Sequence, residues 1–275
     1  MRPGPGQHHI IAACGFVVDL VWRVTSTVWE QTPRYTPYMR NMKPIKLSQR
    51  FEILQGRRRE ISLILAFACV AGLIWGFVAL ADEVLEGDTE HFDRMVAAAM
   101  QGGGAGYDPI GPAWLEELAR DVTALGSYAF LGFLTFGIIG YFLLTDRKGR
   151  AGLVAVSVTG GLLISNLLKS VFDRPRPDFP TEVKVFSASF PSGHAMLSAV
   201  SFLTLGALLA QGSLDTRVKA YIASLAIILT VAVGTTRVYL GVHHATDVLA
   251  GWCVGSAWAL LCWTVARWLQ PRDGA

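Results

Sequence analysis

Charged residues are scarce in this sequence. Only 16% of its 275 residues are Asp, Glu, Lys or Arg, whereas an average soluble domain has about 25%. Hydrophobic residues make up 52%, and the mean hydropathy is +0.41. This balance excludes a disordered chain and argues against an ordinary soluble globule. The formal net charge of +3 is too small to indicate a protein that binds nucleic acid.

Cysteine is also scarce, and no two cysteines form a C-x-x-C pair. Three of the four lie in strongly apolar stretches. This pattern excludes a disulfide or zinc framework and predicts small buried hydrophobic side chains. The cysteines are Cys14, Cys69, Cys253 and Cys262.

The apolar residues are gathered into six long runs that contain no Asp, Glu, Lys or Arg. Each run is close to the roughly 20 residues that a helix needs to cross about 30 Å of hydrocarbon. Backbone groups in lipid must be satisfied within their own segment, so we expect helices. The sequence therefore predicts an all-α polytopic membrane protein with six transmembrane helices in a bundle, and disfavours buried helices of a soluble protein. The runs are Ile61–Ala81, Val122–Thr145, Ala151–Leu168, Ala195–Leu214, Ala220–Thr236 and Val248–Ala266.

The charges between these runs predict the orientation. Basic residues gather before the first run, between runs two and three, between runs four and five, and after run six. By the positive-inside rule these segments and both termini are expected in the cytoplasm, with the chain in the cytoplasmic (inner) membrane. The segment 82–121 holds ten acidic residues against Arg94 and Arg120, and is expected on the periplasmic or extracellular side.

The same reasoning divides the chain into segments. Residues 1–60 are expected to form a cytoplasmic segment, in which Ile10–Val21 is too short to span and predicts an interfacial helix. Residues 61–268 form the six-helix domain, and residues 269–275 a cytoplasmic tail. Within the acidic loop, the apolar spacing predicts short helices over Glu90–Met100 and Trp114–Leu125.

One segment breaks the charge rule. Four cations follow the third run, in a segment that alternating topology places on the outer side. The positive-inside rule does not expect Lys and Arg there, so their position indicates a functional reason. They are Lys169, Arg174, Arg176 and Lys184.

Three polar clusters lie at the outer ends of runs three to six, and alternating topology places all of them on one membrane face. Ionisable groups at that depth indicate a functional site by default. The clusters are Lys169 to Pro177, then Pro191-Ser192-Gly193-His194, then Thr236-Arg237 with His243 and Asp247.

The clusters contain the parts of a phosphate site. Lys169, Arg176 and Arg237 are three cations that need an anion, and phosphate suits the forked donors of arginine and the point charge of lysine. Ser192 is a natural N-cap of the fourth run, and Gly193 allows close approach to the backbone there. The N–H groups at that helix start add a further anion site. Taken singly, each residue has a structural explanation, such as a snorkelling lysine or an ordinary helix start.

Two histidines supply the chemistry. His243 and Asp247 are spaced i, i+4, so the carboxylate can accept from one imidazole nitrogen and leave the other as nucleophile or base. His194 is a second imidazole, available as a general acid. Together these residues predict phosphoryl transfer through a phosphohistidine.

The motifs K-x6-RP, PSGH and SR-x5-H-x3-D resemble the signature of the phosphatidic acid phosphatase type 2 superfamily, with Thr236 where serine is usual. The resemblance implies that His243 attacks phosphorus, that Asp247 orients it, and that His194 protonates the leaving oxygen. It also implies that no metal or other cofactor is needed. The implied phosphate-binding residues are Lys169, Arg176, Ser192, Gly193 and Arg237.

The expected partner is a lipid phosphate within the membrane lipids, with no nucleic acid and no obligate protein partner. Undecaprenyl diphosphate is the favoured substrate, and phosphatidylglycerophosphate, phosphatidic acid and lipid A 1-phosphate are alternatives. Three other readings are a transporter of lipids or phosphate compounds, a catalytically dead lipid-binding homologue, and a metallohydrolase. The last would use His194, His243, His244 and Asp247 as metal ligands.

Overall fold

The computed structural model describes residues 47–101, 109–177, 188–212 and 215–269, with side chains from Glu60 onward. The chain divides into two units, residues 1–54 and 55–275, and the account below concerns the second unit. Several expected features lie outside the described residues. These are the interfacial helix at Ile10–Val21, Cys14, Lys184 and the tail beyond residue 269.

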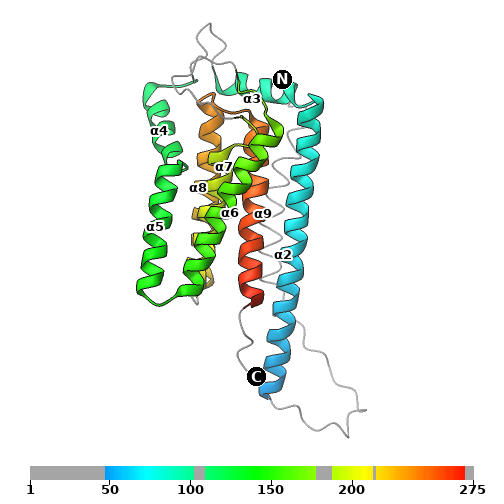
Figure 1. The fold of residues 1–275 in the computed structure, drawn as a ribbon, viewed down its shortest axis with the longest axis vertical. Helices are drawn as coiled ribbons and strands as arrows, with labels where there is room; N and C mark the ends of the chain where they lie inside the picture. The colour runs from blue at the N-terminus through cyan, green and yellow to red at the C-terminus, as the bar shows by residue number, and fades with distance from the viewer. Residues whose placement is uncertain (1–46, 102–108, 178–187, 213–214, 270–275) are drawn as a thin grey trace. The chain divides into compact units, whose positions relative to one another are not determined.

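All regular elements in the described ranges are α-helices (Figure 1). Apart from them, Gln101 and Pro109 form an isolated bridge. The helices are α2 (Leu47–Glu86), α3 (Glu90–Met100), α4 (Ala113–Ala124), α5 (Tyr128–Leu144), α6 (Lys148–Phe172), α7 (Gly193–Gln211), α8 (Thr216–Tyr239) and α9 (Ala245–Leu269).

Five of these helices are long and apolar enough to cross a membrane: α2 over Glu60–Glu86, α6, α7, α8 and α9. A sixth span is available only if α4 and α5 are counted together. The all-α polytopic fold predicted from the six apolar runs is thus confirmed. Of the cysteines in these spans, Cys262 is buried as predicted, whereas Cys69 and Cys253 are half-buried; all three are free thiols.

The predicted run Val122–Thr145 is not one straight helix. α4 ends at Ala124, α5 begins at Tyr128, and the two are bent by 44°. Ser127 caps the start of α5, where its hydroxyl accepts from the Phe130 N–H at 3.1 Å. At the bend, a Cβ on Gly126 would clash with Val233 of α8. The chain therefore turns where a glycine lets it pass close to α8.

α7 is the inner helix of the bundle and packs mainly against α8 and α9. Within its most apolar stretch 67% of the residues are buried, whereas the figure for α2 is 11%. Glycines on α9 permit this packing, since a Cβ on Gly251 would lie 2.7 Å from the Ser192 carbonyl oxygen. A Cβ on Gly255 would clash with the Met196 carbonyl. Close backbone approach thus fixes the start of α7 against α9.

The two short helices predicted in the acidic loop are present as α3 and α4. α3 lies across one end of the bundle, against α8 and α9 (Figure 1). Its Phe92 and Val96 pack against a buried cluster made of Ala195, Val238, Ala245 and Val248. This end of the bundle is also where α6 and α8 finish and where α7 and α9 begin.

Candidate active site

The three polar clusters meet at the end of the bundle that α3 covers. Lys169 is in the last turn of α6, Arg237 in the last turn of α8, and Asp247 in the first turn of α9. The first and third clusters touch, because Arg176 Nη1 donates to the Val242 carbonyl at 2.8 Å. The second and third also touch, because the Ser192 N–H donates to the Asp247 carbonyl at 2.9 Å. The predicted convergence is therefore present.

His243 and Asp247 make the predicted contact, with 3.3 Å between Nδ1 and Oδ2. The turn between α8 and α9 sets their positions. Gly241 adopts a left-handed φ of 67°, and the N–H groups of Val242 and His243 both donate to the Arg237 carbonyl. Both side chains are almost fully buried, at 2% exposure for His243 and 0% for Asp247. With Nδ1 facing the carboxylate, Nε2 is the nitrogen available for chemistry.

The Nε2 atom of His243 faces a cation. Arg176 Nη1 lies 3.2 Å from it. Burial lowers the pKa of His243 to about 4, and the nearby Arg176 and Arg237 lower it further against the opposing effect of Asp247. The imidazole is therefore neutral near pH 7 and keeps a lone pair on Nε2.

Asp247 accepts more hydrogen bonds than the sequence predicted. Besides His243, it accepts from the hydroxyl of Ser189, from the His244 N–H at 2.9 Å, and from Arg174 Nη1 at 2.7 Å. Ser189 also lies 3.3 Å from His243 Nδ1. Nothing in the spacing of the motifs marked Ser189, which comes two residues before Pro191. These donors hold the carboxylate in one orientation.

Arg174 links Asp247 to the acidic loop. Its Nη2 donates to Asp93 of α3 at 2.9 Å, while its Nη1 also donates to Thr246 at 2.9 Å. Asp93 in turn accepts from the N–H and the hydroxyl of Thr246. Sequence reasoning counted Asp93 only as one acid of the loop. It noted Arg174 as a cation on the unexpected side but assigned it no part in catalysis. The available signal was the unexpected position of Arg174 on the outer side.

The cations expected to bind phosphate surround the same space. Lys169 Nζ donates to the Ala188 carbonyl at 2.8 Å, and Arg237 Nη1 donates to Thr123 at 3.2 Å. Within the described residues, Arg237 Nε and the Ser192 hydroxyl are buried without a hydrogen-bond partner. Such groups are costly to leave unpaired, so they fit an anion that accepts from them.

One expectation about a hydroxyl group needs correction. Ser192 occupies the N-cap position of α7, but its side chain makes no capping hydrogen bond. The hydroxyl is instead buried without a hydrogen-bond partner among the described residues, and it stays available as a donor to an anion. Thr236, which replaces the usual serine, donates to the Val233 carbonyl of its own helix at 2.7 Å.

Gly193 has little space above its Cα atom. A Cβ there would lie 2.6 Å from the Tyr128 hydroxyl. The Tyr128 ring packs edge-on against His194, with 6.1 Å between ring centroids. The absence of a side chain at Gly193 thus lets Tyr128 of α5 pack against His194 at the start of α7.

We expect Gly193→Ala to lower kcat/KM by about 100-fold, because the new methyl group must displace Tyr128 or the α7 turn by around 1 Å. Steady-state kinetics on purified protein measures this effect. Tyr128→Phe removes the clashing oxygen, so the double variant Gly193→Ala/Tyr128→Phe should regain most of the loss. If the double variant is as slow as Gly193→Ala alone, the steric explanation is wrong.

The structure also bears on the metallohydrolase reading. Within the described ranges, no three His, Cys, Asp or Glu side chains are placed to hold a metal ion. The four proposed ligands therefore do not form a metal-binding group, and two of them, His243 and Asp247, bond to each other.

Comparisons with known proteins agree with this geometry. The sequence model of the PAP2 superfamily matches residues 150–271, a range that contains all three polar clusters. The chain is 38% identical over 144 residues to phosphatidylglycerophosphatase B of Bacillus subtilis, covering 52% of this chain and 70% of that protein. The chain belongs to the PAP2 superfamily. It is a multi-pass membrane lipid phosphatase of that superfamily.

Two further relatives support the assignment. The undecaprenyl-diphosphatase of Sulfolobus acidocaldarius is 39% identical over 126 residues, covering 43% of this chain and 57% of that protein. The crystal structure of a transmembrane PAP2 type phosphatidylglycerolphosphate phosphatase from Bacillus subtilis superposes with a TM-score of 0.66 at 29% identity. That match covers 73% of this chain and 97% of the solved one, so the PAP2 transmembrane fold extends over most of the described helices.

Proposed function

We propose that this PAP2 phosphatase hydrolyses a membrane lipid phosphate or diphosphate through a phosphohistidine on His243, without a metal ion. The observation that carries the proposal is the environment of His243. It is buried, its Nδ1 faces Asp247, and its Nε2 faces Arg176. A neutral imidazole with one nitrogen held by a carboxylate is an activated nucleophile.

The reaction proceeds in two steps. Nε2 of His243 attacks phosphorus, the bond from phosphorus to the leaving oxygen breaks, and protonated His194 gives its proton to that oxygen. Neutral His194 then takes a proton from water, which attacks phosphorus and breaks the bond to His243. Arg176, Arg237 and Lys169 hold the phosphoryl oxygens and stabilise the transition state, the part that magnesium plays in many phosphoryl-transfer sites.

The favoured substrate is undecaprenyl diphosphate. A diphosphate carries more negative charge than a monoester. Three cations, with an Arg237 Nε and a Ser192 hydroxyl that have no partner among the described residues, offer it many donors. The relative from Sulfolobus acidocaldarius is named for this activity. Phosphatidylglycerophosphate is the second candidate, because the Bacillus subtilis relative is named for it. By the charge distribution, the site faces outward and both termini lie in the cytoplasm.

A phosphate-release panel tests this proposal. Purified full-length protein in detergent is given undecaprenyl diphosphate, phosphatidylglycerophosphate, phosphatidic acid and lipid A, each with and without EDTA. We expect the fastest release from undecaprenyl diphosphate, full activity in EDTA, and inhibition by vanadate. Faster release from phosphatidylglycerophosphate would show that undecaprenyl diphosphate is not the favoured substrate. Loss of activity in EDTA would contradict the metal-free mechanism. If no phosphate were released from any of these lipids, the result would favour the alternative hypothesis of a transporter of lipids or phosphate compounds.

His194→Ala should slow the enzyme according to the leaving group. A lipid alkoxide needs a proton as it departs, whereas a lipid phosphate leaves readily without one, so the variant should lose more activity on a phosphate monoester than on a diphosphate. General acid catalysis contributes about 10²–10⁴-fold, which sets the size of the loss on the monoester. The measurement is kcat on both substrates. An equal loss on both would contradict the general-acid role.

A further inference from the structure

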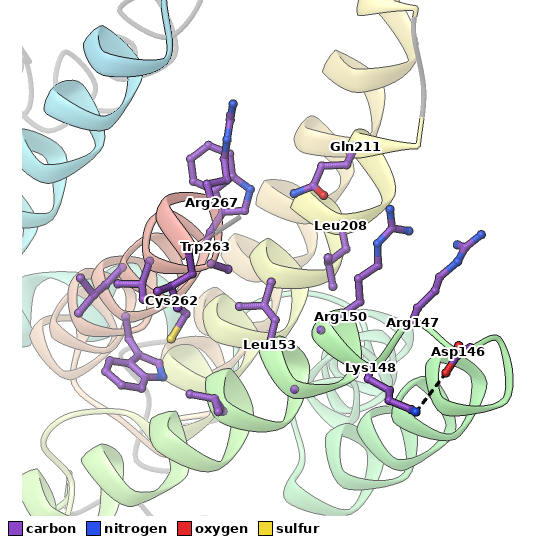
Figure 2. A pocket seen from close by; sticks show the side chains of 18 residues that line it. Asp146, Arg147, Lys148, Arg150, Leu153, Leu208, Gln211, Cys262, Trp263 and Arg267 are labelled. Atoms are coloured by element: carbon purple, nitrogen blue, oxygen red, sulfur yellow. Dashed lines mark ion pairs between the residues drawn. The ribbon is translucent and has the colours of Figure 1, made fainter. Parts of the chain in front are cut away.

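The second unit contains a cavity of about 920 Å³ at the end of the bundle away from His243. Its walls come from the turn before α6, the first turns of α6, the last turns of α7 and the last turns of α9 (Figure 2). The catalytic residues lie at the opposite ends of these same helices. The cavity is therefore separate from the site described above, and its size is typical of a small-molecule site, roughly 300–1,000 Å³.

The cavity has an apolar floor and a basic rim. Leu153 and Leu208 form part of the floor. Figure 2 shows the side chain of Arg267 above them and those of Arg150 and Arg147 to their right. Arg267 stacks on Trp263, with its Cζ 4.8 Å from the ring centroid. Arginine stacked on tryptophan at a helix end is typical of the lipid headgroup region.

The charges around the rim are unbalanced. Asp146 is the one acidic residue in the lining, and it pairs with Lys148 at 3.3 Å. Within the described part of the chain, no ion pair joins Arg147 or Arg150 to a carboxylate. Both arginines also lie at the start of α6, whose first turn holds no acidic residue and whose N-cap makes no side-chain hydrogen bond. Cations are unfavourable at a helix N-terminus unless an anion is nearby.

We propose that this cavity binds an anionic phospholipid of the membrane leaflet opposite the active site. Its phosphate lies between Arg147, Arg150 and the start of α6, where guanidinium and N–H groups can donate to it. Its acyl chains run along the apolar floor that includes Leu153 and Leu208. Basic pockets between transmembrane helices bind acidic lipid headgroups in this way. The site is independent of which lipid is the substrate.

The test uses full-length protein in detergent with phosphatidylglycerol as the probe, because this phosphodiester has no terminal phosphate for the enzyme to remove. We expect phosphatidylglycerol to raise the Tm of the protein, and phosphatidylcholine with the same acyl chains to raise it much less. Equal shifts from the two lipids would overturn the proposal. A shift from inorganic phosphate that is equally large and that Arg147→Gln/Arg150→Gln abolishes would also overturn it, since it would show a simple anion site in the cavity.

Variants locate the effect. Arg147→Gln/Arg150→Gln should remove most of the shift caused by phosphatidylglycerol. The matched control is Arg217→Gln/Lys219→Gln, which removes two exposed cations from the start of α8 at the same end of the bundle but outside the cavity. It should keep the shift. If both pairs lose it equally, general surface charge is responsible and the cavity is not the site.

A third variant blocks the cavity without removing a charge, and its phosphatase activity reports whether it has folded. Gly152 lines the cavity, and a Cβ there meets no atom within 4 Å, so the position has room for a side chain to begin. We expect Gly152→Phe to occupy part of the cavity. It keeps every charge, and it should retain phosphatase activity while losing the phosphatidylglycerol shift. A variant that is active and still shows the full shift would contradict the proposal.

Discussion

His243→Ala is expected to abolish turnover, lowering kcat by about 10⁴-fold or more, as removal of a catalytic nucleophile does in other enzymes. It should also abolish any acid-labile phosphoenzyme, because no other group in the site replaces Nε2. The measurements are steady-state phosphate release and trapping of radiolabelled protein in a brief acid quench. A variant that kept full function would contradict the phosphatase mechanism and favour transport.

His244 provides a matched control for this experiment. It is adjacent, and it contacts Asp247 through its backbone N–H, which the change His244→Ala retains. We expect His244→Ala to stay within a few-fold of the unmodified protein and to form the phosphoenzyme. If both alanine variants lost activity equally, the loss would come from disturbance of the turn between α8 and α9 and would say nothing about a nucleophile.

Arg174→Gln is expected to have the second large effect, on stability. The change leaves Asp93 and Asp247, which are 3% and 0% exposed, without their shared cation. Breaking a buried ion pair in this way costs about 3–5 kcal/mol in the free energy of unfolding. The loss should appear as a lower Tm. The control is Arg94→Gln on α3, whose pair with Glu90 is exposed and should contribute at most about 1 kcal/mol.

The same variant tests whether Arg174 positions the catalytic carboxylate. We expect kcat to fall while KM changes little, since Arg174 acts through Asp247 and not on the substrate. Asp93→Asn/Arg174→Gln should recover part of the Tm, because one unpaired buried charge is removed. It should not recover kcat, since Asp247 still lacks the hydrogen bond from Arg174. Recovery of both together would show that Arg174 has only a structural role.

The sequence predicted those features that depend on local pattern. Apolar runs of transmembrane length identified the membrane helices, because a span must satisfy its own backbone. The i, i+4 spacing of His243 and Asp247 predicted their contact, since two side chains one helical turn apart lie on the same face. Alternating topology brought Lys169, Ser192 and Arg237 to one end.

Features that depend on approach between distant segments were not predicted. The bend between α4 and α5 brings Gly126 against Val233 of α8, and a glycine in an apolar run gives no sign of such a contact. Asp93 and Arg174 are 81 residues apart, and Asp93 looked like any other acid of its loop. Ser192 was expected to cap a helix, but its buried hydroxyl makes no capping hydrogen bond.

The burial of α7 has an evolutionary consequence. The start of this helix carries Ser192 and His194, and its length is enclosed by α8 and α9, so few of its positions can accept a larger side chain. In the most apolar stretch of α2 only 11% of the residues are buried, so this helix has more room to vary. We therefore expect members of the superfamily to diversify in the lipid chains they accept through outer helices such as α2, while the residues around α7 stay the same.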